Sequence, residues 1–191
     1  NALLRAAGLP PAYTERPLDD SELAPVRRVI AQVLANHEPY PAVALGAGLA
    51  IHSTNRPAEL LWPGMTDMEP RQLVEAWCTL DPAQPRDIAL QNVYRAVRVL
   101  RRDVLHHPHP GMPELLEHAE RLAAALGPEP ELEDEVVLCP TMVVDGQVLR
   151  TLSTVMRFDK PADVTMQELR VELVFPADDA TEAFFRALAA G

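Results

Sequence analysis

The sequence is poor in cysteine, in aromatic residues and in positive charge, and each shortage narrows the range of functions. Only 2 of the 191 residues are cysteine, and Cys78 and Cys139 each stand alone in an apolar stretch. Metal-binding and disulfide frameworks need several cysteines at defined spacings. We therefore expect two buried free thiols in a reducing cytosol, with a Cys78–Cys139 bridge as the alternative.

Positive charge is scarce relative to negative charge. The chain has 17 lysines and arginines against 28 aspartates and glutamates, which gives a formal net charge of -11. Nucleic-acid affinity depends on clusters of basic side chains that displace counterions from the phosphate backbone. We expect that this chain does not bind DNA by itself.

Long apolar runs are missing too, and nothing approaches the stretch of about 20 residues that a membrane helix needs. The opening NALLRAAGLPP has no basic region or cleavage pattern of a signal peptide. These features predict a cytoplasmic protein without a membrane partner. Asn1 in place of methionine indicates a piece of a longer protein or a processed form. A chain of this length can bury roughly 70% of its unfolded surface, enough for one domain with a short extension.

Motifs for catalysis or metal binding are absent. His106, His107 and His109 alternate with prolines in HHPHPG, without cysteine or HExxH spacing, which is typical of a solvated loop. The acidic run Glu129–Glu135 is typical of a hydrated linker, and Ser153 lacks a GxSxG turn. We predict no enzyme activity, no cofactor and no metal. The alternative is a small α+β enzyme that uses the His106/His107/His109 loop with an acidic partner.

The first part of the chain has capping and helix-ending residues that predict a helix, two strands and a second helix. Asp19 and Glu22 have the spacing of a capping box, with Asp20 and Ser21 as alternative caps, and the prolines of HEPYP end the helix that follows. Two short strands are predicted at 42–46 and 49–54, and Asn55 is placed to cap the next helix. The apolar face of the first helix consists of Leu23, Val26, Val29, Ile30, Val33 and Leu34.

The rest of the chain changes from helical to strand periodicity. Three helices are predicted at 69–78, 86–105 and 113–126. Asp145-Gly146 then predicts a hairpin between strands 136–144 and 147–158. A loop over KPADVTMQ (160–167), a strand at 169–175 and a helix at 181–188 complete the pattern.

Two strands, a helical region and three further strands predict an α+β fold. We expect a PAS-like five-stranded antiparallel sheet with helices packed on one face, and a ligand cavity between the layers. The domain spans 19–191. Residues 1–18 form a linker, with a short helical stretch at 2–7 that Gly8 ends.

Three segments of the chain together resemble the ligand-binding domain of MmyB-like transcription regulators. They are PAYTERPLDDSELAPVRRVIAQVLANHEPYPAVAL, HSTNRPAELL, whose Asn55 matches a pattern position, and RTLSTVMRFDKPADVTMQELRVELVFPAD. Residues 64–135 depart from the family pattern, since they have Trp77 and HHPHPG where the family has an Arg-rich, Trp-containing block that ends in a Trp–His pair.

The resemblance implies the sensing half of a transcription regulator. In such proteins this PAS-like domain follows an XRE-type helix-turn-helix, which is missing here, so DNA would be bound only through that N-terminal domain. The partner implied is a small apolar ligand, fatty-acid-like in some members, and the expected assembly is a homodimer. A ligand-free dimerisation module with a filled core is the remaining alternative.

The ligand pocket is expected between the sheet and the helices at 55–62, 70–78 and 86–105. Aromatic and apolar side chains of these segments serve equally well as core or as pocket lining, and one arginine of the third segment turned inward could pair with an anionic head group. The candidate ligand-binding residues are Tyr40, Asn55, Leu61, Trp62, Trp77, Tyr94, Val97, Arg98, Val155 and Leu173.

Overall fold

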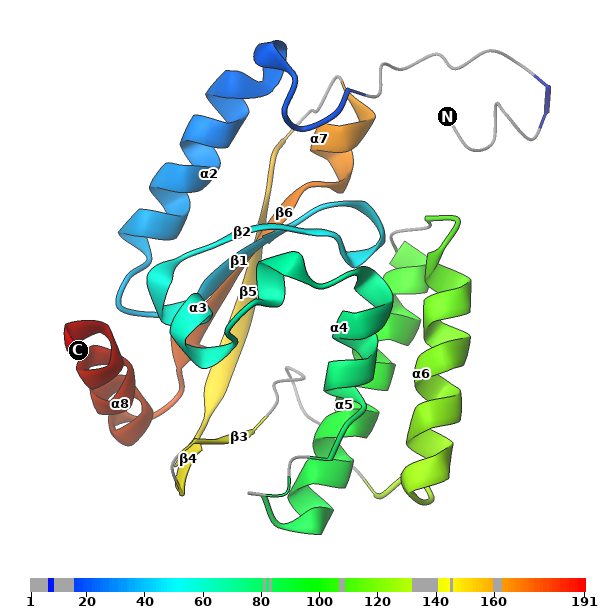
Figure 1. The fold of residues 1–191 in the computed structure, drawn as a ribbon, viewed down its shortest axis with the longest axis vertical. Helices are drawn as coiled ribbons and strands as arrows, with labels where there is room; N and C mark the ends of the chain where they lie inside the picture. The colour runs from blue at the N-terminus through cyan, green and yellow to red at the C-terminus, as the bar shows by residue number, and fades with distance from the viewer. Residues whose placement is uncertain are drawn as a thin grey trace.

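The computed structural model describes most of the chain (Figure 1). The described ranges are 7–8, 16–80, 82, 84–106, 109–131, 141–144, 146–159 and 163–191. Some predictions concern residues outside these ranges. They are the predictions for residues 2–6 of the helical stretch 2–7, for His107, for Cys139 and for strand residues 136–140. Within them, no helix combines the length and the apolar character of a membrane span.

The described strands form a four-stranded antiparallel sheet in the order β2-β1-β6-β5. The α+β class is confirmed, but the prediction of a five-stranded main sheet is wrong for the residues described. β3 and β4 instead form a separate two-stranded ribbon. The strands are β1 (Ala42–Leu45), β2 (Ile51–Thr54), β3 (Met142–Val144), β4 (Gln147–Leu149), β5 (Thr151–Arg157) and β6 (Arg170–Pro176).

The predicted long hairpin stops at Arg150 because this residue bonds to the end of the chain. Its backbone N–H donates to Thr181 Oγ1 at 3.0 Å, and its carbonyl accepts from the N–H of Ala177 at 2.8 Å. The ladder between β3 and β4 therefore ends there, and β5 pairs along its whole length with β6.

Helices cover both faces of the sheet, so the prediction of helices on one face is wrong. Ala42 and Ala44 pack against α2 (Ala24–Asn36), whereas Val43 and Leu45 face α3 (Arg56–Leu61) and the residues after it. All four residues of β1 are buried. Because side chains alternate along a strand, an apolar AVAL segment needs cover on both sides.

Three helices form a group beside the second face of the sheet, separate from α2 (Figure 1). They are α4 (Pro70–Trp77), α5 (Arg86–His106) and α6 (Met112–Leu126), all close to the predicted bounds. The fully buried side chains of Val93, Val97 and Leu100 belong to the apolar core of this group. One face of α5 therefore packs against α4 and α6, and the adjacent face of α5 is directed toward the sheet.

The shorter elements decide one open cap and contain one correction. Of the candidate caps Asp19, Asp20 and Ser21, Asp20 caps the first turn, because its Oδ1 accepts from the N–H of Glu22 at 2.8 Å. A helix forms in the predicted 160–167 loop because Asp163 caps it through the N–H of Thr165. The remaining elements are η1 (Ser21–Leu23), η2 (Ala47–Leu49), η3 (Met65–Asp67), α7 (Val164–Glu168) and α8 (Asp179–Ala190).

The turn between β1 and β2 connects the sheet to the helical group. Gly48 has φ 59°, and a Cβ on it would lie 2.9 Å from Nδ1 of His109. Leu49 has φ 70°, a conformation that is unfavourable for a leucine, and its side chain is buried in the core of α4–α6. Burial of this side chain offsets the local backbone strain.

Candidate ligand-binding site

A cavity of about 480 Å³ lies between the second face of the sheet and the helices α4 and α5. Val43 and Val174 line it from the sheet, and Ala96 and Val99 line it from α5. We call it the sheet–helix cavity. Its volume is in the range of small-molecule sites in proteins.

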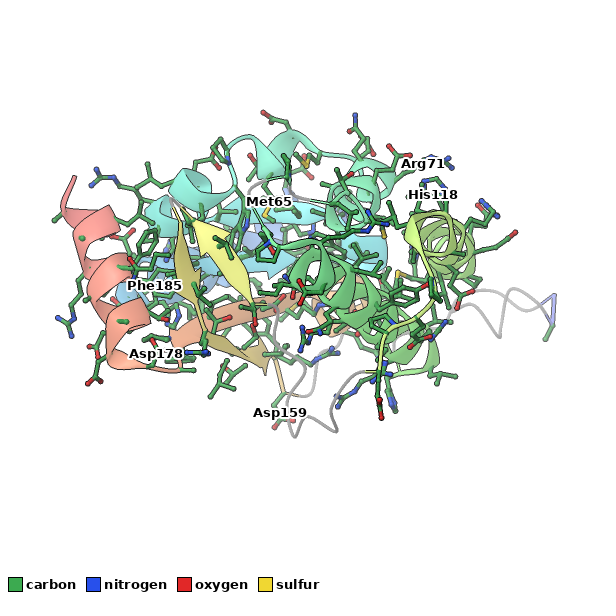
Figure 2. All side chains as sticks on the ribbon, turned by 90° about the horizontal axis from the view of Figure 1, so that it is seen from below. Met65, Arg71, His118, Asp159, Asp178 and Phe185 are labelled. Atoms are coloured by element: carbon green, nitrogen blue, oxygen red, sulfur yellow. The ribbon has the colours of Figure 1, made fainter. Side chains whose placement is uncertain are left out.

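Most of the lining is apolar, and two tryptophans and two methionines contribute to it. Trp62 follows α3, Met65 begins η3, Met68 follows η3, and Trp77 ends α4. Figure 2 shows Met65 near the middle of the molecule, away from the outer helices. Large, adaptable side chains of this kind suit an apolar molecule rather than a sugar or a phosphate.

Asn92 and Arg95 bring polar groups to the cavity from α5. The Asn92 Oδ1 accepts from the N–H of Thr141 at 3.1 Å and from the Arg95 guanidinium at 3.3 Å. The Asn92 side-chain amide donates to the Thr141 carbonyl and, at 3.2 Å, to Gln84 Oε1. Asn92 thus fixes the approach of the chain to β3 at one end of the cavity.

Glu172 places a carboxyl group on the sheet side of the cavity, in the middle of β6. Burial raises the pKa of this carboxyl, while the positive charge of Arg170 and a hydrogen bond with Ser153 act in the opposite direction. Asp103 adds a smaller effect that raises the pKa. An ionisable group so enclosed is a candidate for ligand recognition.

An ion pair between α5 and β6 lies near Glu172. Arg170 donates to Asp103 Oδ2 at 2.8 Å, and the two side chains are 13% and 17% exposed. Arg157 stands opposite Arg170 in the β5–β6 ladder. Burial and the charge of Arg170 lower the pKa of Arg157. Glu172 therefore has a largely buried ion pair nearby.

The cavity lies between the sheet and the three helical segments from which the sequence interpretation drew a pocket. Of the ten candidate residues, Trp62 and Trp77 line it. The Tyr94 hydroxyl instead donates to the Gly127 carbonyl at 2.8 Å, and Val97 is in the core of α4–α6. Arg98 forms an ion pair with Glu129 at 3.2 Å.

The other candidates also lie outside the lining of the cavity. The Tyr40 hydroxyl donates to Glu182 at 3.1 Å on the α8 side, and Leu173 packs in the cluster of α2. Val155 is 50% exposed, and Leu61 is half-buried beside the cavity.

Asn55 is the N-cap that its position predicted. Its Oδ1 accepts from the N–H groups of Ala58 and Ala42, and its amide donates to the carbonyls of Tyr40 and Leu34. The side chain is 6% exposed and joins α3, β1 and the end of α2. Its role is architectural.

Sequence reasoning missed Asn92, Ser153 and Glu172 as cavity residues. Glu172 carried a signal, because it is a single acidic residue between Val171 and Leu173 in an apolar strand. Arg95 belongs to the arginine group of α5, for which an inward-turned member was the alternative to a solvated face, and it lines the cavity where Arg98 does not.

The histidines do not gather into a metal site in the described part of the chain. His106 ends α5, and His109 lies against Gly48. His118 Nε2 lies 2.9 Å from Glu75 Oε1, and His118 Nδ1 lies 3.4 Å from the Arg71 guanidinium. Figure 2 shows Arg71 and His118 side by side. The described ranges contain no group of three histidine, cysteine or acidic side chains that could hold an ion.

A second hollow of about 500 Å³ lies on the outside, between α2 and β2. It is more open than the sheet–helix cavity, and charged side chains such as Glu38 and Arg56 border it. Arg27 there donates to the Leu18 and Asp20 carbonyls and holds the lead-in segment. A groove with these contacts is part of the packing of the N-terminal segment.

Comparison with known proteins gives one match. The family model of the MmyB-like transcription regulator ligand binding domain matches residues 26–188, which run from α2 to α8 and include every residue that lines the sheet–helix cavity. No curated protein and no solved structure matches the chain.

Proposed function

The chain belongs to the family of MmyB-like transcription regulator ligand binding domains, and we propose that it senses a small apolar molecule held in the sheet–helix cavity. The family is one of regulatory ligand-binding domains rather than of enzymes, in agreement with the expectation of no enzyme activity. The finer proposal concerns the ligand, whose body would be an aliphatic chain like the tail of a fatty acid.

The apolar lining of the cavity is the observation that supports this proposal. Trp62, Met65, Met68 and Trp77 face β1 and β6 across about 480 Å³. Each buried methylene contributes about 0.8 kcal/mol, so a chain of about a dozen methylenes would contribute roughly 10 kcal/mol before ordering costs. Affinity of this kind needs shape and apolar surface rather than a signature motif.

The ligand would act by bridging two layers of the domain. A molecule in contact with Val174 on the sheet and with Ala96 on α5 would favour one distance between them. A ligand shifts an equilibrium only by its difference in affinity for the two states. We propose that this shift changes the conformation of a homodimer in the cytoplasm and thereby sets the operator affinity of an N-terminal helix-turn-helix. Residues 1–18 would serve as the linker between that domain and this one.

The two tryptophans offer a direct test with the protein itself. Both tryptophans of the sequence line the cavity, so titration with decan-1-ol should change the intrinsic fluorescence of the 191-residue chain. Ala96→Phe should fill the cavity and weaken binding about tenfold or more.

Ala124→Phe is the matched control, since Ala124 is exposed on α6 and outside the lining of the cavity. It should bind decan-1-ol as the unchanged chain does. Absence of binding to the unchanged chain, or equal binding by both variants, would contradict the proposal.

A further inference from the structure

We propose that the ligand carries a basic nitrogen, protonated at neutral pH, whose charge pairs with Glu172. The inference rests on the proposed function, because it specifies the polar head of a molecule whose apolar body occupies the same cavity. It starts from one fact: within the described residues, Glu172 is the single acidic side chain that lines the cavity.

The carboxyl of Glu172 can accept more hydrogen bonds than the protein is shown to supply. A carboxylate has about four acceptor positions, and Ser153 interacts with one of its oxygens. The short contact of the nearby Arg170 is with Asp103, at 2.8 Å. A ligand N–H group that reached the Glu172 end of the cavity would meet an acceptor in a place with little water.

The charges around Glu172 come from three elements. Arg170 is two residues before it on β6, Arg157 stands opposite Arg170 on β5, and Asp103 lies on α5. Asp103 and Arg170 neutralise each other. A ligand cation would therefore pair with Glu172 beside this balanced pair, with the Arg157 guanidinium as a further positive charge on β5.

Arg95 is the one basic side chain in the described lining, and it reaches the cavity from α5, whereas Glu172 reaches it from β6. It is two helical turns before Asp103, about 12 Å along α5, and its guanidinium donates to Asn92. Its charge is not among the influences on the Glu172 carboxyl. The 3.3 Å hydrogen bond of Arg95 is with Asn92 rather than with Glu172.

Three kinds of head group can be compared at this place. A carboxylate would meet a like charge where Glu172 is ionised, and would have to share a proton with it otherwise. A hydroxyl would form a neutral hydrogen bond, whereas an ammonium group would form a charge-assisted one, which is roughly twice as strong. The net charge of -11 also concentrates cations near the protein. A cation would stabilise the ionised form of Glu172, and the long-range field of the acidic protein acts in the same direction.

The test uses matched ten-carbon probes, decan-1-amine, decan-1-ol and decanoic acid, each kept below micelle formation and titrated at neutral pH. Fluorescence of Trp62 and Trp77 reports occupancy of the cavity. We expect the amine to bind about tenfold or more tightly than the acid. Glu172→Gln should weaken binding of the amine about tenfold and leave binding of the alcohol within about threefold.

Glu117→Gln is the control for net charge. Glu117 is exposed on α6, is paired with Arg121 and is outside the lining of the cavity. The substitution therefore removes the same charge as Glu172→Gln without altering the cavity. It should leave the order of the three probes unchanged.

The outcomes separate this inference from the proposed function. If the alcohol binds but the acid binds as tightly as the amine, or if Glu172→Gln leaves binding of the amine unchanged, the cationic head is wrong and the apolar cavity stands. If none of the three probes binds the unchanged chain, the proposed function fails and the inference fails with it. The probe series on the unchanged chain needs no variant to fold.

Discussion

Asp103 on α5 and Arg170 on β6 form an ion pair 2.8 Å long that joins the longest helix to a central strand. Both side chains are largely buried. Charges in such a place stabilise the fold as a pair and cost free energy when one is left alone.

Asp103→Asn should therefore destabilise the domain by about 2–4 kcal/mol, since it leaves the Arg170 charge without its partner and close to Arg157. Denaturant unfolding would measure the change. Glu117→Gln, which breaks an exposed pair with Arg121, should cost no more than about 0.5 kcal/mol. Equal losses in the two variants would show that the buried pair has no special role.

Asn55→Ala should cost about 3 kcal/mol, because it leaves four backbone groups around the side chain without their partner. Asn55→Ser keeps an acceptor for the N–H of Ala58 and should lose less. Thermal unfolding of both variants would check this order. A smaller loss for alanine than for serine would contradict the architectural role of Asn55.

Glu172→Gln should stabilise the unliganded domain as the pH rises. Burial raises the pKa of the native carboxyl above its ordinary value of 4.5, so the native state binds the proton more tightly than the unfolded state does. The unchanged chain then loses stability between pH 4.5 and the native pKa, and glutamine does not.

Thermal unfolding of the two proteins across this pH range should show a difference that is small in acid and grows toward neutral pH. A difference that shrinks as the pH rises would mean that the native carboxyl is stabilised as an anion. That result would also conflict with the enclosed position of Glu172 in the sheet–helix cavity.

Cys78 should resist thiol reagents in the native protein. The side chain is 4% exposed, and burial raises the pKa of the thiol to about 11, so little thiolate exists at neutral pH. In a Cys139→Ser background, labelling should be about a hundredfold slower in buffer than in denaturant. Rapid labelling of the native chain would show that the region around Cys78 opens easily.

Local chemistry was predictable from the sequence, and long-range pairing was not. Asn55 was identified as a cap because capping depends on the residue and on the few that follow it. The partner of β5 was not identified, because Asp145-Gly146 indicates where a hairpin turns but not where its ladder ends. That end is set by bonds between Arg150 and the start of the C-terminal helix, far along the chain.

The same limit applies to the candidate site. The apolar pattern of α5 includes both Val97, which faces the other helices, and Ala96, which faces the cavity. Periodicity identifies these apolar positions but not the element that packs against each of them. Trp62 and Trp77 were identified because large side chains near the sheet are candidates in any arrangement. Glu172 was missed because its surroundings come from β5 and α5 as well as from its own strand.

The pairing of Ala42 with Leu173 bears on the order in which the chain folds during synthesis. The helices α4, α5 and α6 lie between the two central strands in the sequence and contact one another, so they can pack as soon as they leave the ribosome. β1 has to wait for β6, since closing so long a loop costs entropy before the sheet contacts form. The sheet side of the cavity is then the last part to assemble, and a nascent chain would need protection of its AVAL strand until that moment.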